Sequence, residues 1–129
     1  TASYPLPICN RAAFLALQQF NVERATVWVE LGETGINTLL SQLGRAGEVL
    51  TYARLPMLST RMDIPVTGPI QDARGAKFTV EQGRDTTLLL PEAVFAVEPE
   101  VPCHRFVDLT HARLGERTTS AFNYPRELV

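Results

Sequence analysis

Three polar side chains that could bind a ligand follow an apolar run in the middle of the chain. Residues 49–53 (VLTYA) have the length and the β-branched and aromatic content of a buried strand. Arg54 then adds a charge and Pro56 removes a backbone donor, so we expect the strand to reach the rim of a sheet here. Arg54, Ser59 and Arg61 would offer donors suited to a small anionic or amide-bearing ligand.

The residues before this rim alternate between strand and helix patterns. A short strand is predicted over 5–9, and Asn10 is a good N-cap for an amphipathic helix over 11–20. A nearly continuous apolar strand follows over 25–31, and a second helix over 34–43 leads to the rim strand. This alternation with short connections predicts an α/β unit with parallel strands.

The packing of this unit can also be predicted. We expect the strands around Ile8, Trp28 and Leu50 to be adjacent and parallel. The helix side chains that should cover one face of them are Phe14, Leu17, Leu39 and Leu43.

After Asp63 the pattern changes to antiparallel strands. Prolines and glycines form a linker, and the turn at 71–75 places Gly75 in a left-handed position. Strands are predicted over 77–80, 86–90, 94–97 and 104–109, before a polar tail over 110–129 with one short helix and coil. We expect a single domain over 1–129, with β/α units at 1–63, a β-hairpin insertion at 64–100, and a last strand and tail at 101–129.

Composition excludes several classes of protein. The net charge of −2 gives no reason to expect nucleic-acid binding, and no apolar run is long enough for a membrane span, so a cytoplasmic protein is the expectation. Cys9 and Cys103 are 94 positions apart, without metal-ligand spacing, and are predicted to be buried free thiols. The chain starts at Thr1 rather than Met, which suggests a processed or excised fragment.

The order of several segments resembles the C-terminal half of the collagenase-like peptidase family U32. In that family a helix begun by Asn leads to a strand ending in Glu-Leu, then to a Tyr-Gly-Arg-Leu-Pro-Leu-Met strand end, a Lys-Asp-Arg-Lys-Gly hairpin and a Tyr-Arg-Ile-Asp strand. The resemblance covers residues 5–109, and ARLPM and DARG are its most specific parts. The matching segments are NRAAFLALQQFNVERATVWVEL, EVLTYARLPMLSTR, GPIQDARGAKFTV, DTTLLLPEAVFAVE and HRFVDL.

The resemblance implies a fold and a place for function. The family's catalytic domain is similar to a (β/α)8 barrel, so this chain would hold about four barrel strands with an inserted antiparallel hairpin region. Half a barrel exposes two sheet edges, which predicts a homo-oligomer or a missing N-terminal half as partner. Barrel sites lie at the carboxyl ends of the strands, which here are Asn10, Glu30, Arg54 and Asp108.

Each of these four residues also has a structural interpretation. Asn10 caps a helix, and Asp108 is expected to have a structural role. Glu30 and Arg54 could form an ion pair between neighbouring strands or bind a ligand together, because both would emerge at the same edge of the sheet.

The departures from the family bear on its chemistry. Some family members hold an iron–sulfur cluster, but Met62 and Asp63 stand where cysteines would follow the Arg-Leu-Pro segment, so we expect no cluster and no other cofactor. No GxSxG, HExxH or Cys/His dyad supports peptidase chemistry. The resemblance therefore implies a fragment or subunit of a U32 peptidase with incomplete catalytic groups. The alternatives are a non-catalytic α/β module that binds a peptide or small anion or serves assembly, and part of an RNA- or quinone-modifying relative.

Overall fold

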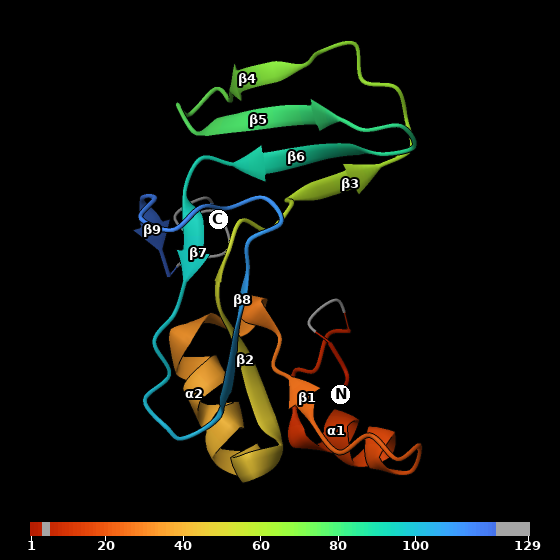
Figure 1. Ribbon diagram of the computed structural model, residues 1–129, viewed down its shortest axis with the longest axis vertical. Helices are drawn as coiled ribbons and strands as arrows, with labels where there is room; N and C mark the ends of the chain where they lie inside the picture. The colour runs from red at the N-terminus through yellow and green to blue at the C-terminus, as the bar shows by residue number, and fades with distance from the viewer. Residues whose placement is uncertain (4–5, 121–129) are drawn as a thin grey trace.

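The computed structural model describes residues 1–3 and 6–120, which form two sheets and two α-helices. Figure 1 shows both helices beside β1, β2 and β8 at one end of the molecule and a four-stranded antiparallel sheet at the other. β7 and β9 lie between these ends and belong to the sheet of β1 and β2. The chain therefore enters the antiparallel sheet after β2 and leaves it after β6.

The first sheet is organised around β2 (Gly47–Ala53). β1 (Ala25–Thr26) pairs with the start of β2 in parallel, and β8 (His104–Asp108) pairs in parallel along the opposite edge. β7 (Val94–Ala96) pairs antiparallel with the end of β2, and β9 (Thr118–Thr119) adds to β7 in parallel. The mixed α/β class is confirmed.

The predicted parallel neighbours are confirmed, but one strand is shorter than expected. Ile8 forms a parallel bridge with Val27, beside the pairing of β1 with β2. The predicted strand over 25–31 is wrong at its end, because the 3-10 turn η1 (Val29–Leu31) leads directly into α2. Pro5, at the start of the first predicted strand, lies outside the described residues.

Both helices form where the apolar spacing predicts them. α1 (Arg11–Gln18) begins with the Asn10 side chain accepting a hydrogen bond from the Ala13 N–H at 2.8 Å, so the predicted cap is confirmed. α2 (Gly32–Leu43) ends at Gly44, and the 3-10 turn η2 (Gly44–Ala46) connects it to β2. The four side chains predicted to cover the strands, Phe14, Leu17, Leu39 and Leu43, all join the core around β2.

The second sheet has the strand order β3-β6-β5-β4 and is antiparallel throughout. Its strands are β3 (Leu58–Thr60), β4 (Gly68–Gln71), β5 (Lys77–Gln82) and β6 (Thr87–Pro91). Gly75, with φ of 88°, sits in the β4–β5 turn in the left-handed conformation that the DARG sequence predicts. Burial alternates along β5, where Phe78 and Val80 are buried, so one face of this sheet is apolar.

A segment near the end of the described chain joins the two sheets. We call residues 109–117 the strap, since they run from β8 back to β9 and contact both sheets. The short helix predicted in the tail is not found within residues 110–120, and residues 121–129 of the predicted tail lie outside the described residues.

Candidate functional site

The rim predicted at the end of β2 is a junction between the two sheets and the strap. The Arg54 guanidinium donates to the Glu92 carbonyl at 3.1 Å and forms an ion pair with the Glu116 carboxylate. The Arg54 and Glu116 side chains are 20% and 29% exposed, so water only partly screens the pair. Arg54 thus links β2 to the chain after β6 and to the strap.

One hydrogen bond within the strap and one from β2 hold the segment around Glu116 in place. The Glu116 carboxylate accepts from the Arg113 N–H at 2.5 Å, and the Arg113 carbonyl accepts from the Tyr52 hydroxyl at 2.5 Å. The Arg113 N–H first, and the Arg54 guanidinium after it, lower the pKa of Glu116 below its ordinary value. Glu116 therefore stays ionised at neutral pH.

The strap also contacts the antiparallel sheet. His111 Nδ1 lies 3.7 Å from a Glu81 carboxylate oxygen on β5, and Ala112 is buried. On its other side, the Arg117 carbonyl accepts a hydrogen bond from the Val94 N–H at 2.9 Å, next to the pairing of β7 with β9. The strap therefore covers the end of β2 and contacts it at Arg54.

Two of the predicted rim residues are placed differently from what the sequence indicates. The partner of Arg54 is Glu116, so the predicted ion pair with Glu30 is wrong. Glu30 is exposed in η1 and does not end a strand, because the strand conformation of β1 stops at Thr26. The prediction was wrong because the apolar run continues to Val29, which is buried but lies in a 3-10 turn and not in a strand.

The remaining predicted residues lie apart from this junction. Asn10 caps α1, and the Asp108 carboxylate at the end of β8 accepts from the Thr110 N–H at 2.9 Å. Ser59 is exposed on β3. Arg61 lines a separate hollow, which is lined by none of the other predicted residues.

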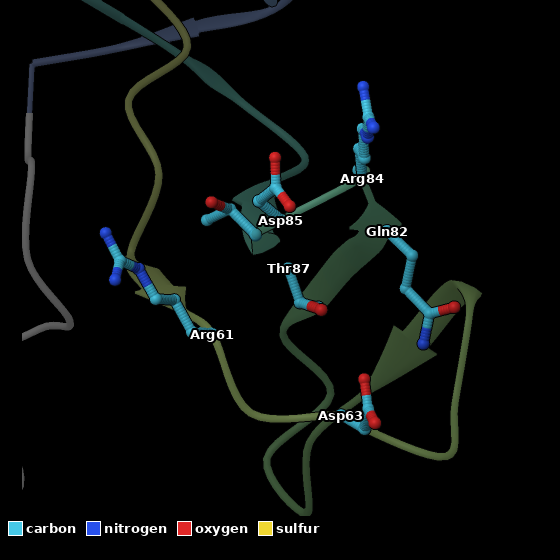
Figure 2. A pocket seen from close by; sticks show the side chains of 8 residues that line it. Arg61, Asp63, Gln82, Arg84, Asp85 and Thr87 are labelled. Carbon is cyan, nitrogen blue, oxygen red and sulfur yellow. The ribbon is translucent and has the colours of Figure 1, made fainter.

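This hollow lies at one end of the antiparallel sheet and has a volume of about 590 Å³. The loop after β3 contributes Arg61 and Asp63, and the turn between β5 and β6 contributes Arg84 and Asp85. Thr87, at the start of β6, lies between these two groups (Figure 2). The hollow therefore combines two cations, two carboxylates and the side chains of two threonines, Thr86 and Thr87.

Two hydrogen bonds fix the walls of the hollow. The Gln82 side-chain amide at the end of β5 donates to the Ile64 carbonyl at 2.6 Å, which holds the β3–β4 loop against the sheet. The Gly83 N–H donates to the Thr86 carbonyl at 2.8 Å, which closes the β5–β6 turn. These two hydrogen bonds restrict the loops that line the hollow.

The structure also bears on metal binding and on the cysteines. Within residues 1–3 and 6–120, no three His, Cys, Asp or Glu side chains are grouped as a metal ion would require. Cys9 and Cys103 are free thiols, as predicted, but Cys9 is exposed rather than buried. Burial raises the pKa of the partly buried Cys103 thiol above its ordinary value, so it is a weak nucleophile at neutral pH.

Sequence reasoning missed Glu116 and most of the hollow. Glu116 lies in a polar stretch of sequence. Its one local signal is that it directly follows Gly115, a turn residue with φ of 86°. Asp63, Arg84 and Asp85 are in loops that join different strand pairs, and only the order of the strands brings these loops together. For Arg84 and Asp85, the signal in the sequence is that two charged residues directly follow the turn residue Gly83.

Comparisons with known proteins found no matching protein-family model, curated protein or solved structure. None of the described helices is both long and apolar enough to cross a membrane.

Proposed function

We propose that this chain supplies part of a U32-type barrel, the scaffold of a collagenase-like peptidase or of a relative that modifies RNA or quinones. The parallel arrangement supports the proposal: the Ile8 bridge, β1, β2 and β8 follow one another as parallel neighbours, with α1 and α2 between the first three. This is the order that a segment of a (β/α)8 barrel would have. Further strands would complete both the barrel and its catalytic groups.

The observation that carries the proposal is the outer edge of β8. No strand of the described residues pairs with that edge, although β8 is parallel to the central strand β2. Val107 and Leu109, in and just after β8, are 49% and 50% exposed. An open edge beside half-exposed apolar side chains is suited to pairing with another strand.

The test is association through this edge. We expect the chain to form oligomers in sedimentation experiments, and the double variant Val107→Lys/Leu109→Lys to be monomeric, because charges on an edge strand oppose pairing. The control is Leu114→Lys, since Leu114 is 74% exposed outside β8. A stable monomer of the unmodified chain at high concentration would contradict pairing through β8, and the intact mass of the native gene product would show whether further strands lie in the same polypeptide.

A non-catalytic assembly module is the second candidate, and the Arg54 junction favours it. In a barrel enzyme the carboxyl ends of the strands face the substrate. Here the guanidinium at the end of β2 is bound to Glu116 and to the Glu92 carbonyl, which is the arrangement of a residue that holds segments together. Cleavage of gelatin by the native gene product would contradict the non-catalytic module and support the peptidase form of the first candidate.

A further inference from the structure

We infer that Arg54 is the centre of a binding site for a carboxylate ligand, and that the strap keeps this site closed by placing the Glu116 carboxylate where the ligand's carboxylate would bind. The strap is then an autoinhibitory segment, and Glu116 takes the place of the ligand. The inference does not depend on the barrel proposal or on pairing through β8, because it concerns contacts of Arg54 within one chain.

The first observation is a buried nitrogen of Arg54 that has no hydrogen-bond partner. Within the described part of the chain, the Arg54 Nε is the one buried side-chain nitrogen or oxygen without a partner. The neighbouring Nη2 has two acceptors, the Glu116 carboxylate and the Glu92 carbonyl. Buried donors are generally paired, and an unpaired donor destabilises the arrangement that contains it. The closed junction therefore leaves one of the two donors on this edge of the guanidinium unused.

The second observation is that Glu116 uses only one of its oxygens on Arg54. Its Oε2 accepts from Nη2, whereas its Oε1 accepts from the Arg113 N–H within the strap at 2.5 Å. Nε and Nη2 lie on one edge of the planar guanidinium, and such an edge can hold both oxygens of one carboxylate. A ligand that is not tied to the strap is free to bind with both oxygens. It would pair the Nε that Glu116 leaves unpaired.

The position of Arg54 in the first sheet is the third observation. Arg54 directly follows β2, and β2 ends beside the end of its parallel neighbour β8. In open α/β sheets, ligands bind outside the carboxyl ends of the parallel strands. The strap, which runs from β8 to β9 in Figure 1, contacts Arg54 at this end of the sheet. Glu116 therefore lies where a ligand of such a sheet would bind.

The strap is held by contacts that can open locally. Ala112 is its one buried residue, and six of its nine residues are exposed. It contacts β5 through the His111–Glu81 pair at 3.7 Å, and it accepts one hydrogen bond each from the Tyr52 hydroxyl and the Val94 N–H. Segments with few buried contacts open at low free energy without global unfolding. Opening would remove the Glu116 carboxylate from Arg54 while β2 remains in the core.

Glu116 competes with any ligand from within the same chain. A tethered group acts at an effective concentration on the order of 1 mM or more, so a small free carboxylate binds weakly while Glu116 is charged. Replacing Glu116 with a neutral side chain removes this competitor. A larger carboxylate ligand that also contacts the sheet would displace the strap at a lower concentration.

The experiment follows the Arg54 Nε–H and Leu55 amide resonances by NMR in the full chain, with acetate as the probe. In Glu116→Gln we expect saturable shifts with a dissociation constant on the order of 10 mM, and binding about tenfold weaker in the unmodified chain. Sodium chloride at the same ionic strength should give no saturable shift. No saturation by acetate up to about 100 mM in Glu116→Gln, or equal affinity in the unmodified chain, would overturn the inference.

Variants assign the binding to Arg54. Adding Arg54→Lys to Glu116→Gln keeps the positive charge but removes the planar fork, so acetate binding measured at the Leu55 amide should weaken by about tenfold. Glu98→Gln is the matched control, because Glu98 pairs with the exposed Arg105 and its replacement should leave acetate affinity as in the unmodified chain. Glu116→Ala, which also removes the acceptor, should bind acetate at least as tightly as Glu116→Gln. Unchanged affinity in the Arg54→Lys double variant would contradict the assignment.

Discussion

The two sheets of this protein are stabilised in different ways. The parallel strands around β2 are buried beneath helices, and Val49, Leu50 and Ala53 have no exposed surface. Among the described residues, the antiparallel sheet has no helix of its own. It buries Phe78 and Val80 on one face and is joined to the rest by the strap and by β7. The comparison shows that the first sheet is held by side-chain packing, whereas the second depends more on turns and on polar contacts at its ends.

The largest expected effect comes from creating a cavity in the core around β2. Leu50→Ala should lower the free energy of unfolding by about 3 kcal/mol, because Leu50 is fully buried in the core and its replacement leaves a cavity. Chemical denaturation measures this change. Leu58→Ala is the control in the other sheet, since Leu58 is 46% exposed; equal losses for the two variants would contradict the proposed difference.

Breaking the junction between the sheets should have the next largest effect. Arg54→Ala removes the ion pair with Glu116 and the hydrogen bond to the Glu92 carbonyl, and should cost about 1 to 2 kcal/mol. Hydrogen exchange should become faster in the strap and remain slow in β2. Arg105→Ala is the control. Arg105 pairs with Glu98, but the two side chains are 47% and 79% exposed, so this pair should contribute little. An equal drop in melting temperature for Arg105→Ala and Arg54→Ala would refute the distinction.

A turn in the antiparallel sheet tests its dependence on local geometry. Gly75→Ala should destabilise the β4–β5 hairpin by about 1 kcal/mol, because φ of 88° is strained for any residue with a side chain and the new Cβ would lie 3.3 Å from the Gln71 amide nitrogen. Amide exchange in β4 and β5 is the measurement. Equal acceleration in β1 and β2 would show that the two sheets unfold as one unit.

The smallest effect is a dependence on pH. The pKa of Glu116 is lowered in the folded protein, so its contribution to stability is complete above the ordinary glutamate pKa of about 4.3 and is lost as the pH falls through the lower folded-state value. We expect melting temperature to fall more steeply in acid for the unmodified chain than for Glu116→Gln. Identical acid profiles would mean that Glu116 does not stabilise the junction.

Much of the first sheet could be predicted from the sequence, since its signals are local. The Asn10 cap, the apolar spacing of both helices and the buried run before Arg54 each specify an element within a few residues. Parallel pairing then follows from the short connections between strand and helix. The predicted strand over 25–31 ends early because apolar composition does not distinguish an extended residue from one in a 3-10 turn.

The candidate sites could be predicted only in part, because they depend on contacts between distant segments. Arg61 was expected beside Arg54 and Ser59 at the rim, but it lines a separate hollow at one end of the antiparallel sheet. Glu116 was not identified as the partner of Arg54, because the two residues are 62 positions apart and the strap between β8 and β9 brings them together. No local pattern specifies how such a strap lies.

The pairing of β2 with β8 has a consequence for the order of folding. Thr51 donates to the Phe106 carbonyl across these strands at 3.0 Å, although the two residues are 55 positions apart. Most of the intervening chain belongs to the antiparallel sheet, whose hairpin pairings are local. If that sheet forms first, it shortens the loop that β8 must close and lowers the entropic barrier by on the order of 1 kcal/mol. Early formation of the antiparallel sheet would then speed the pairing of β8 with β2.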